Sequence, residues 1–152
     1  MEFAKKIVET TEEIFSTMIF MDIAPEAPLE QGKQALGCHV SAMIGLTGGF
    51  SAMLGVHCPE AVGLAVAGAM LGMEIDEIDA DVKDALGEIA NMAAGGLKER
   101  FAAENIDLEL AIPTAISGNS YTISSSTRSN RLIIPFRVEQ GQFFIEMKYN
   151  LN

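Results

Sequence analysis

The chain has 152 residues, of which 49% are hydrophobic and 20% are charged, and its formal net charge is −11. This length allows a buried core, and the composition excludes a disordered protein. The acidic balance excludes the usual nucleic-acid-binding proteins, which need clustered Lys and Arg.

The sequence contains no apolar run long enough to cross a membrane, so we expect no membrane insertion. The N-terminus begins an acidic amphipathic segment, whereas a signal peptide has a basic start and an apolar run. We therefore expect a cytoplasmic protein that forms a single domain over residues 1–152.

A first helix is expected over residues 2–20, where apolar side chains recur at spacings near 3.6 residues. Two prolines in the segment Asp22–Pro28 end it. Residues 37–58 predict a hairpin that turns at Gly48 and pairs residues whose numbers sum to 96. Apolar residues alternate along both arms, which predicts one buried face and one mixed face.

Two cysteines and two histidines lie near the ends of this hairpin. Adjacent strand residues point to opposite faces, so Cys38 and Cys58 share one side while His39 and His57 share the other. The four side chains then cannot converge on one zinc ion. We interpret them as two buried, reduced thiols and a cross-strand His pair, and the sequence assigns the histidines no further role.

Two more helices are expected, over residues 59–71 and from about Asp79, a plausible N-cap, to Ala103. Six acidic residues lie between Glu74 and Asp84, which suits either solubility alone or a partner with a basic rim.

Further strands are expected over residues 108–116, broken at Pro113, and over residues 121–126, followed by a polar loop at 124–131. A closing hairpin turns at Gln140–Gly141 and pairs residues whose numbers sum to 281. Pro135 predicts an edge strand or an unpaired donor position there.

The order helix-then-hairpin occurs twice along the chain. We therefore predict an α/β fold of the α+β type, with pseudo-symmetric halves, a mainly antiparallel sheet and helices on one face. A short echo supports this symmetry: Glu9, Glu13 and Ser16 recur, offset by 75 positions, as Asp84, Glu88 and Asn91.

One polar line runs along the long helix, at positions 84, 88, 91 and 95, opposite the apolar stripe. Gly87 and Gly95 are unfavourable within a helix but leave room for another backbone to approach. Either Glu88 and Asn91 form a site that a partner completes, or this line is a solvated face with glycines that loosen the helix.

The triplet of Asp84, Glu88 and Asn91, with Pro113 about twenty residues later, resembles the signature of the CheC/CheX/FliY family of chemotaxis phosphatases. The first helix, the Gly-rich hairpin, Pro113–Thr114 and the closing hairpin are also CheX-like. Only Glu88 has an Asn three residues later, which resembles the single-site CheX pattern. Glu13 and Ser16 are then interpreted as a non-site.

The resemblance implies a hydrolase of two-component signalling that removes the aspartyl phosphate from CheY, a response-regulator receiver. It assigns Asn91 to orient the attacking water and Glu88 to pair with a receiver lysine. Asp84, Gly87 and Gly95 are expected to contact or accommodate the receiver. The resemblance implies no metal or cofactor on this chain, with Mg²⁺ on the receiver.

The resemblance also implies a homodimer formed through the sheet, at exposed strand edges or at the face of Met43 and Met53. Two alternatives stay open. One is a non-catalytic adaptor of the same fold that binds a receiver or flagellar switch component, and the other is a purely structural dimer. The identity of the receiver and of the pathway is not encoded in any motif.

Overall fold

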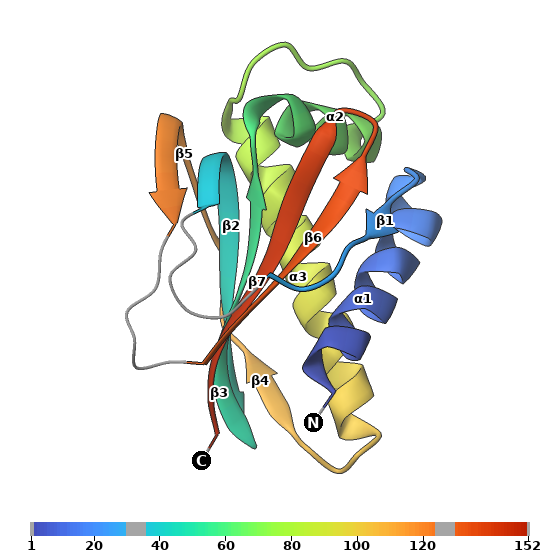
Figure 1. Cartoon of the computed structure of the whole chain (residues 1–152), viewed down its shortest axis with the longest axis vertical. Coiled ribbons are helices and arrows are strands. Elements are labelled where there is room, and N and C mark those ends of the chain that lie inside the picture. The colour runs from blue at the N-terminus through green and yellow to red at the C-terminus, as the bar shows by residue number, and fades with distance from the viewer. Residues whose placement is uncertain (1, 30–35, 124–129, 152) are drawn as a thin grey trace.

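The structure, a computed structural model, describes residues 2–29, 36–123 and 130–151. Within these ranges, helices lie on one face of a seven-stranded antiparallel sheet, the predicted α+β architecture (Figure 1). The sheet order is β1-β6-β7-β3-β2-β4, and β5 also pairs with β2. The strands are β1 (Ala24–Pro25), β2 (Leu36–Gly48), β3 (Phe50–Cys58), β4 (Leu108–Leu110), β5 (Thr114–Ile123), β6 (Asn130–Val138) and β7 (Gly141–Leu151).

The predicted helices are present, with nearly the predicted bounds. Asp79 caps the long helix, because its side chain accepts a hydrogen bond from the backbone N–H of Val82 at 3.1 Å. Gly72 ends the preceding helix in the left-handed conformation, with φ 69°. The helices are α1 (Phe3–Ile14) with its continuation η1 (Phe15–Ile19), α2 (Glu60–Leu71) and α3 (Ala80–Ala102).

The last turn of the first helix, η1, is a π-helix, which the sequence did not predict. The hydroxyls of Ser16 and Thr17 both donate to the carbonyl of Glu13, at 3.2 and 2.6 Å. Such side-chain bonds compete with the regular helical hydrogen bonds at the point where the helix widens. The turn ends at Phe20, a bulky residue in the left-handed conformation, with φ 61° and ψ 51°.

The β2–β3 hairpin has the predicted faces, but the predicted pairing is wrong by two residues. Val40 pairs with Cys58, so paired numbers sum to 98. The reason is that Gly48 belongs to β2 and pairs with Leu108 of β4. A Cβ on Gly48, whose φ is 140°, would lie 2.3 Å from the Asp107 carbonyl oxygen. Gly48 is therefore a strand residue whose missing side chain lets the Asp107 backbone pass close to β2.

The closing hairpin shows the same kind of error. Val138 pairs with Gly141, so the turn consists of Glu139 and Gln140, and paired numbers sum to 279. Gly141, with φ 144°, begins β7. Strand β6 is not outermost, because the short strand β1, which the sequence did not predict, pairs with it. The Pro135 carbonyl accepts the Glu26 N–H on that side, at 2.9 Å.

The prediction of two buried, reduced thiols is confirmed, but the predicted shared face of the cysteines and the predicted histidine pair are wrong. Cys58 belongs to the main core, whereas Cys38 packs in a second cluster with Leu36 and Ile133, where β2 shifts register against β5. The thiols are buried and free, and burial raises the pKa of both. The histidines do not pair: the Nδ1 atom of His39 accepts the backbone N–H that begins α2, at 3.2 Å, and His57 pairs with Ser41.

The predicted break at Pro113 is confirmed, since β4 ends at Leu110 and β5 begins at Thr114. The prediction of a separate strand that begins at Tyr121 was wrong, because β5 runs without a break from Thr114 to Ile123. The predicted strand end at 124–126 and most of the predicted loop at 124–131 lie outside the described residues.

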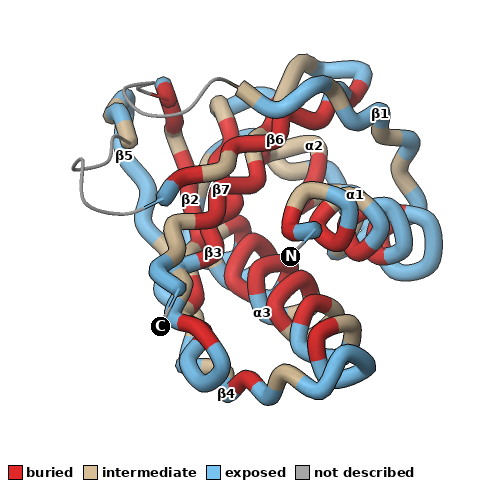
Figure 2. Tube along the Cα trace, turned by 60° about the horizontal axis from the view of Figure 1, so that its bottom comes forward, coloured by how far each residue is buried: buried red, intermediate tan, exposed pale blue. Residues whose placement is uncertain are grey.

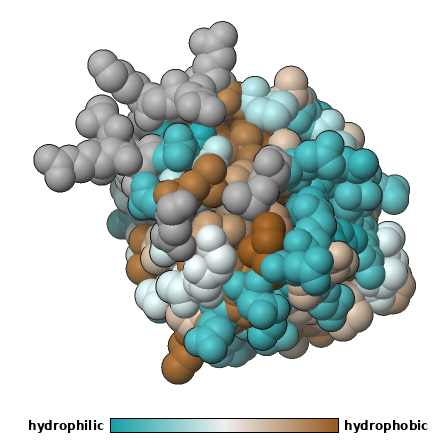
Figure 3. Space-filling view, turned by 90° about the horizontal axis from the view of Figure 1, so that it is seen from below, coloured by the Kyte–Doolittle hydropathy of each residue, from teal (hydrophilic) through white to brown (hydrophobic). Residues whose placement is uncertain are grey.

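The main core lies between the helices and one face of the sheet (Figure 2). The two hairpins, β2–β3 and β6–β7, join through the central pair of strands, β3 and β7. None of the described helices is both long enough and apolar enough to span a membrane. On the end of the molecule that is lowest in Figure 1, hydrophobic and hydrophilic side chains are interspersed (Figure 3).

Candidate active site

The polar line on α3 borders a groove of about 530 Å³. Asp84, Glu88 and Asn91 are exposed, whereas the apolar stripe on the other side of the helix is buried in the core. Because the buried stripe holds α3 against the sheet, these three side chains stand on a rigid support. The groove is lined by Ala80, Lys83, Asp84, Gly87, Glu88, Asn91, Pro113 and Ala115.

The two predicted clearance glycines differ in position. A Cβ on Gly87 or Gly95 would meet no atom within 4 Å, so neither glycine is required by packing against the rest of the fold. Gly87 lines the groove, but Gly95 lies about two turns further along α3 and is not among the lining residues. By contrast, a Cβ on Gly96 would lie 2.5 Å from the Thr10 Cγ2 atom, so Gly96 is required for packing against α1.

The facing wall of the groove comes from a distant part of the sequence. Pro113 and Ala115 border the start of β5, which packs beside α3. Both β4 and β5 pair with β2, and the two strands are separated in the sequence by Pro113. Proline fixes its own φ and lacks an N–H, so it interrupts the pairing with β2 where the chain passes the groove. This places the second part of the predicted signature, Pro113, beside the first.

The groove also holds Lys83, which the sequence analysis did not single out. The spacing could have indicated it, because positions 80, 83, 87 and 91 follow one flank of a helix. Lys83 places one cation beside the two carboxylates of Asp84 and Glu88.

Glu88 and Asn91 are available to a partner. Their side chains are exposed, and within the described residues neither makes a hydrogen bond or an ion pair. A carboxylate accepts hydrogen bonds and pairs with a cation, whereas a carboxamide both donates and accepts. This pair can thus bind a cationic side chain and orient a water molecule. In the described ranges, no three His, Cys, Asp or Glu side chains are placed to hold a metal ion.

The pseudo-symmetric position in α1 is built differently. The Glu13 carboxylate accepts a hydrogen bond from the Arg100 guanidinium of α3 at 2.8 Å. The Ser16 hydroxyl is bonded to the Glu13 carbonyl, and the π-helical turn begins between these two residues. These contacts support the interpretation of Glu13 and Ser16 as a non-site.

A buried polar network, which the sequence analysis missed, lies on the helix-free face of the sheet. His57 contacts the Ser41 hydroxyl at 2.8 Å and a Glu146 carboxylate oxygen at 3.0 Å. Tyr121 donates to Ser41 at 2.8 Å, and Arg131 forms an ion pair with Glu146. Ser, His and Glu together suggest hydrolytic chemistry, but Ser41 and His57 are fully buried, so a substrate cannot reach them. The network is structural.

A family model described as Chemotaxis phosphatase CheX matches residues 40–137. The CheY-P phosphatase CheX of Thermotoga maritima is 33% identical over 84 residues, which cover 55% of this chain and 54% of that protein. The match therefore spans about half the length of this curated relative.

Solved structures resemble nearly the whole chain. The chemotaxis protein CheX of Desulfovibrio desulfuricans is 33% identical, with a TM-score of 0.89, and the match covers 99% of this chain and 100% of that one. The CheX–CheY–BeF3–Mg²⁺ complex of Borrelia burgdorferi gives a TM-score of 0.81 over 97% of both chains. Its identity is 19%, so this likeness shows the fold alone.

Proposed function

The chain belongs to the CheX family of chemotaxis phosphatases, and from this membership we propose that it hydrolyses the aspartyl phosphate of a CheY-like receiver. We place the reaction at the α3 groove. The observation that carries this assignment is that Glu88 and Asn91 stand exposed and unpaired, within the described residues, beside Gly87 on a rigid helix. The Thermotoga relative is named for the same activity.

An acyl phosphate is already activated, so a phosphatase needs chiefly to position water. In our proposal the Asn91 carboxamide enters the receiver site and holds a water in line with the phosphorus. The water oxygen forms a bond to phosphorus while the bond to the aspartyl oxygen breaks. Phosphate and the receiver carboxylate are released, and the water protons pass to phosphate and solvent. The receiver brings its own Mg²⁺, which would neutralise phosphoryl charge.

Glu88 is assigned to docking. Its carboxylate, three residues before Asn91 on the same helix face, would pair with a receiver lysine and fix the direction of approach. Asp84 extends the acidic surface one turn towards the N-terminus of α3, and Gly87 lets the receiver backbone come close to the helix. Lys83, beside them, would face the acidic side chains or the phosphate of the receiver.

The test uses candidate receivers from the same cell, phosphorylated in vitro, and follows phosphate loss. We expect the wild type to accelerate the loss, and Asn91→Ala to reduce the acceleration by about 10²-fold while binding persists. Glu88→Ala should chiefly weaken binding and raise KM. Lys98→Ala, an exposed change on α3 outside the groove, is the matched control and should behave as wild type.

Full activity of the Asn91→Ala protein would show that the site assignment is wrong. Binding of phosphorylated receivers without faster decay would establish the alternative, a non-catalytic adaptor.

We also propose the homodimer that the family resemblance implies. Within the part of the chain that the structure describes, the exposed strand β5 pairs with β2 alone, so its other edge could join a second copy; sedimentation over a range of concentrations tests this dimer.

A further inference from the structure

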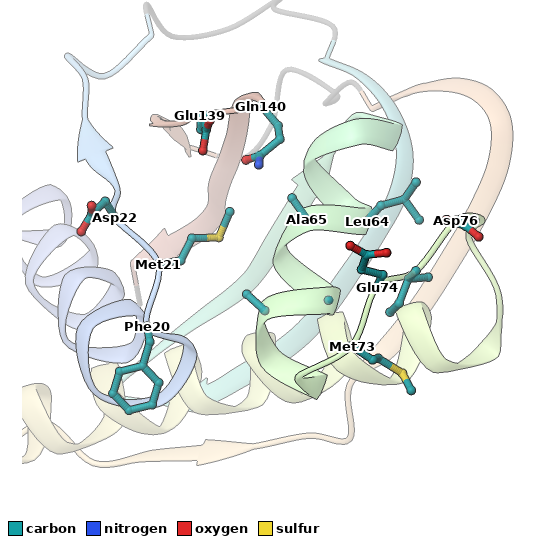
Figure 4. Close-up of a pocket in the computed structure, with 13 residues that line it drawn as sticks. Phe20, Met21, Asp22, Leu64, Ala65, Met73, Glu74, Asp76, Glu139 and Gln140 are labelled. Carbon is teal, nitrogen blue, oxygen red and sulfur yellow. The ribbon is translucent and has the colours of Figure 1, made fainter.

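A second groove, of about 730 Å³, lies at the end of the molecule opposite to that in Figure 3. It is bordered by the residues after η1, by helix α2 with the segment that follows it, and by the β6–β7 turn (Figure 4). It shares no lining residue with the α3 groove. We call it the α2 groove.

Apolar side chains form part of the lining of the α2 groove, and some of them are open to solvent. Phe20 is 79% exposed and Met73 is 57% exposed, at two separate parts of the groove. Met21 and Leu64 contribute further apolar surface, Met21 from the segment after η1 and Leu64 from α2 (Figure 4). Phe20 and Met73 are among the large hydrophobic side chains that the protein leaves in water, and exposed apolar side chains in a groove with a polar rim are typical of interaction sites.

The backbone that presents Phe20 is unusual in two respects. A π-helical turn leads into it, and Phe20 itself adopts the left-handed conformation, which is disfavoured for bulky residues. The phenyl ring is exposed to solvent, where it gains little packing energy. A strained conformation that exposes an apolar side chain indicates a role outside the stability of the fold.

The rim of the groove is acidic. Asp22, Glu74, Asp76 and Glu139 lie around it, and no Lys or Arg is among the lining residues. Within the described residues, none of these four side chains forms an ion pair or a hydrogen bond. The four carboxylates come from three separate segments, so the fold, and not one acidic run, assembles this charge around the apolar surface.

We propose that the α2 groove binds a basic amphipathic segment of another protein. Apolar side chains of that segment would pack against Phe20, Met21 and Leu64, while its Lys and Arg residues would meet the acidic rim. A second copy of this chain is disfavoured as the occupant of this groove, because the four rim carboxylates call for a basic segment and the chain has 21 acidic against ten basic residues. This proposal goes beyond the phosphatase function and does not depend on it.

The test measures binding of a fluorescent synthetic helical peptide made of leucine and lysine, with leucine at every third or fourth position. The full-length protein should bind this peptide and not a scrambled peptide that lacks an apolar face. Amide shifts of the labelled protein should cluster at Phe20, α2 and the β6–β7 turn. Phe20→Ser should weaken binding several-fold, and the variant D22N/E74Q/D76N/E139Q should weaken it about tenfold.

The matched control is E9Q/E99Q/D107N/E109Q, which removes four exposed charges outside the groove and should leave binding within about twofold of wild type. Equal losses of peptide affinity in both quadruple variants would show that binding depends on net charge alone and would overturn the proposal. Absence of peptide binding, or amide shifts that cluster at the α3 groove, would also overturn it. Self-association that Phe20→Ser abolishes would assign the groove to a second copy instead.

Discussion

The Nε2 atom of His57 lies 3.0 Å from a carboxylate oxygen of Glu146, with both side chains almost fully buried between β3 and β7. A carboxylate only accepts hydrogen bonds, so Nε2 must carry the proton. In the neutral imidazole, the Nδ1 atom then accepts from the Ser41 hydroxyl, which itself accepts from Tyr121. In that protonation state the hydrogen bonds run in one direction, from the tyrosine to the glutamate. Gly55 makes room for it, because a Cβ there would lie 2.6 Å from Nε2.

The first prediction concerns acid stability. Burial alone would raise the pKa of Glu146, but hydrogen bonds from His57 and Arg131 outweigh it, and the pKa is lowered from 4.5. A lowered folded-state pKa stabilises the protein above the unfolded value, and this stabilisation is lost as pH falls through the folded value. Glu146→Gln should lower the free energy of unfolding by about 3–5 kcal/mol near neutral pH.

Urea unfolding from about pH 7 to about pH 3 measures this effect. The difference between wild type and Glu146→Gln should shrink below the unfolded-state pKa of 4.5. Glu109→Gln, at an exposed position, is the control and should unfold like wild type. A difference that stays constant across the whole range would contradict the lowered pKa.

The second prediction separates two glycines of α3. Gly87→Ala should raise the free energy of unfolding by about 0.5–1 kcal/mol, because alanine favours helix and its Cβ meets no atom. Gly96→Ala should lower it by about 1–3 kcal/mol through the clash with Thr10. If the α3 groove binds the receiver, Gly87→Ala should also raise KM. Thermal unfolding and the phosphatase assay measure the two effects, and equal stability of the variants would refute the packing argument.

The third prediction concerns Thr10, whose buried hydroxyl has no hydrogen-bond partner among the described residues. Thr10→Val keeps the shape and removes the unsatisfied group, so we expect a gain of about 1 kcal/mol in the free energy of unfolding. The neighbouring change Thr11→Val is the control, because the Thr11 hydroxyl donates to the Ile7 carbonyl at 2.7 Å. Denaturant unfolding should rank Thr10→Val above wild type and Thr11→Val at or below it; the reverse order would show that Thr10 is satisfied.

The fourth prediction addresses the left-handed residue Phe20. Asparagine tolerates this conformation better than other non-glycine residues, whereas alanine does not. Phe20→Asn and Phe20→Ala both remove an exposed ring, so they differ mainly in backbone preference. We expect Phe20→Asn to be more stable than Phe20→Ala by about 0.5–1 kcal/mol, measured by thermal unfolding. Equal melting temperatures would mean that the backbone relaxes around position 20.

Much of the fold could be predicted because helical spacing and strand alternation report which side of each element is buried. The stripe from Val82 to Phe101 and the inward faces of both hairpins followed from this pattern. The register of the strand pairs in the two hairpins did not follow from it. A shift of two residues keeps every side chain on its face, so alternation cannot detect it. The deciding contacts, such as the approach of Asp107 to Gly48, come from distant segments.

The α3 site could be predicted as a line on a helix, since Asp84, Glu88 and Asn91 follow one face. Its second wall required the tertiary fold, which brings Pro113 beside α3. The buried charges of Arg131 and Glu146 could not be predicted, because alternation assigns them to the solvent-facing side of β6 and β7. The two charges pair with each other across the β6–β7 hairpin, but Glu146 also needs His57, which lies 89 positions away in the sequence.

The central position of the β3–β7 pair has a consequence for how the chain folds. Each hairpin closes between neighbouring segments, but β3 and β7 come from opposite halves of the sequence, with Phe50 next to Leu151. Joining them requires closure of a long loop, which makes contact formation slow relative to the local hairpins. During synthesis, the edge of β3 that β7 covers therefore stays unpaired until β7 has left the ribosome, and an unpaired strand edge of this kind is open to aggregation.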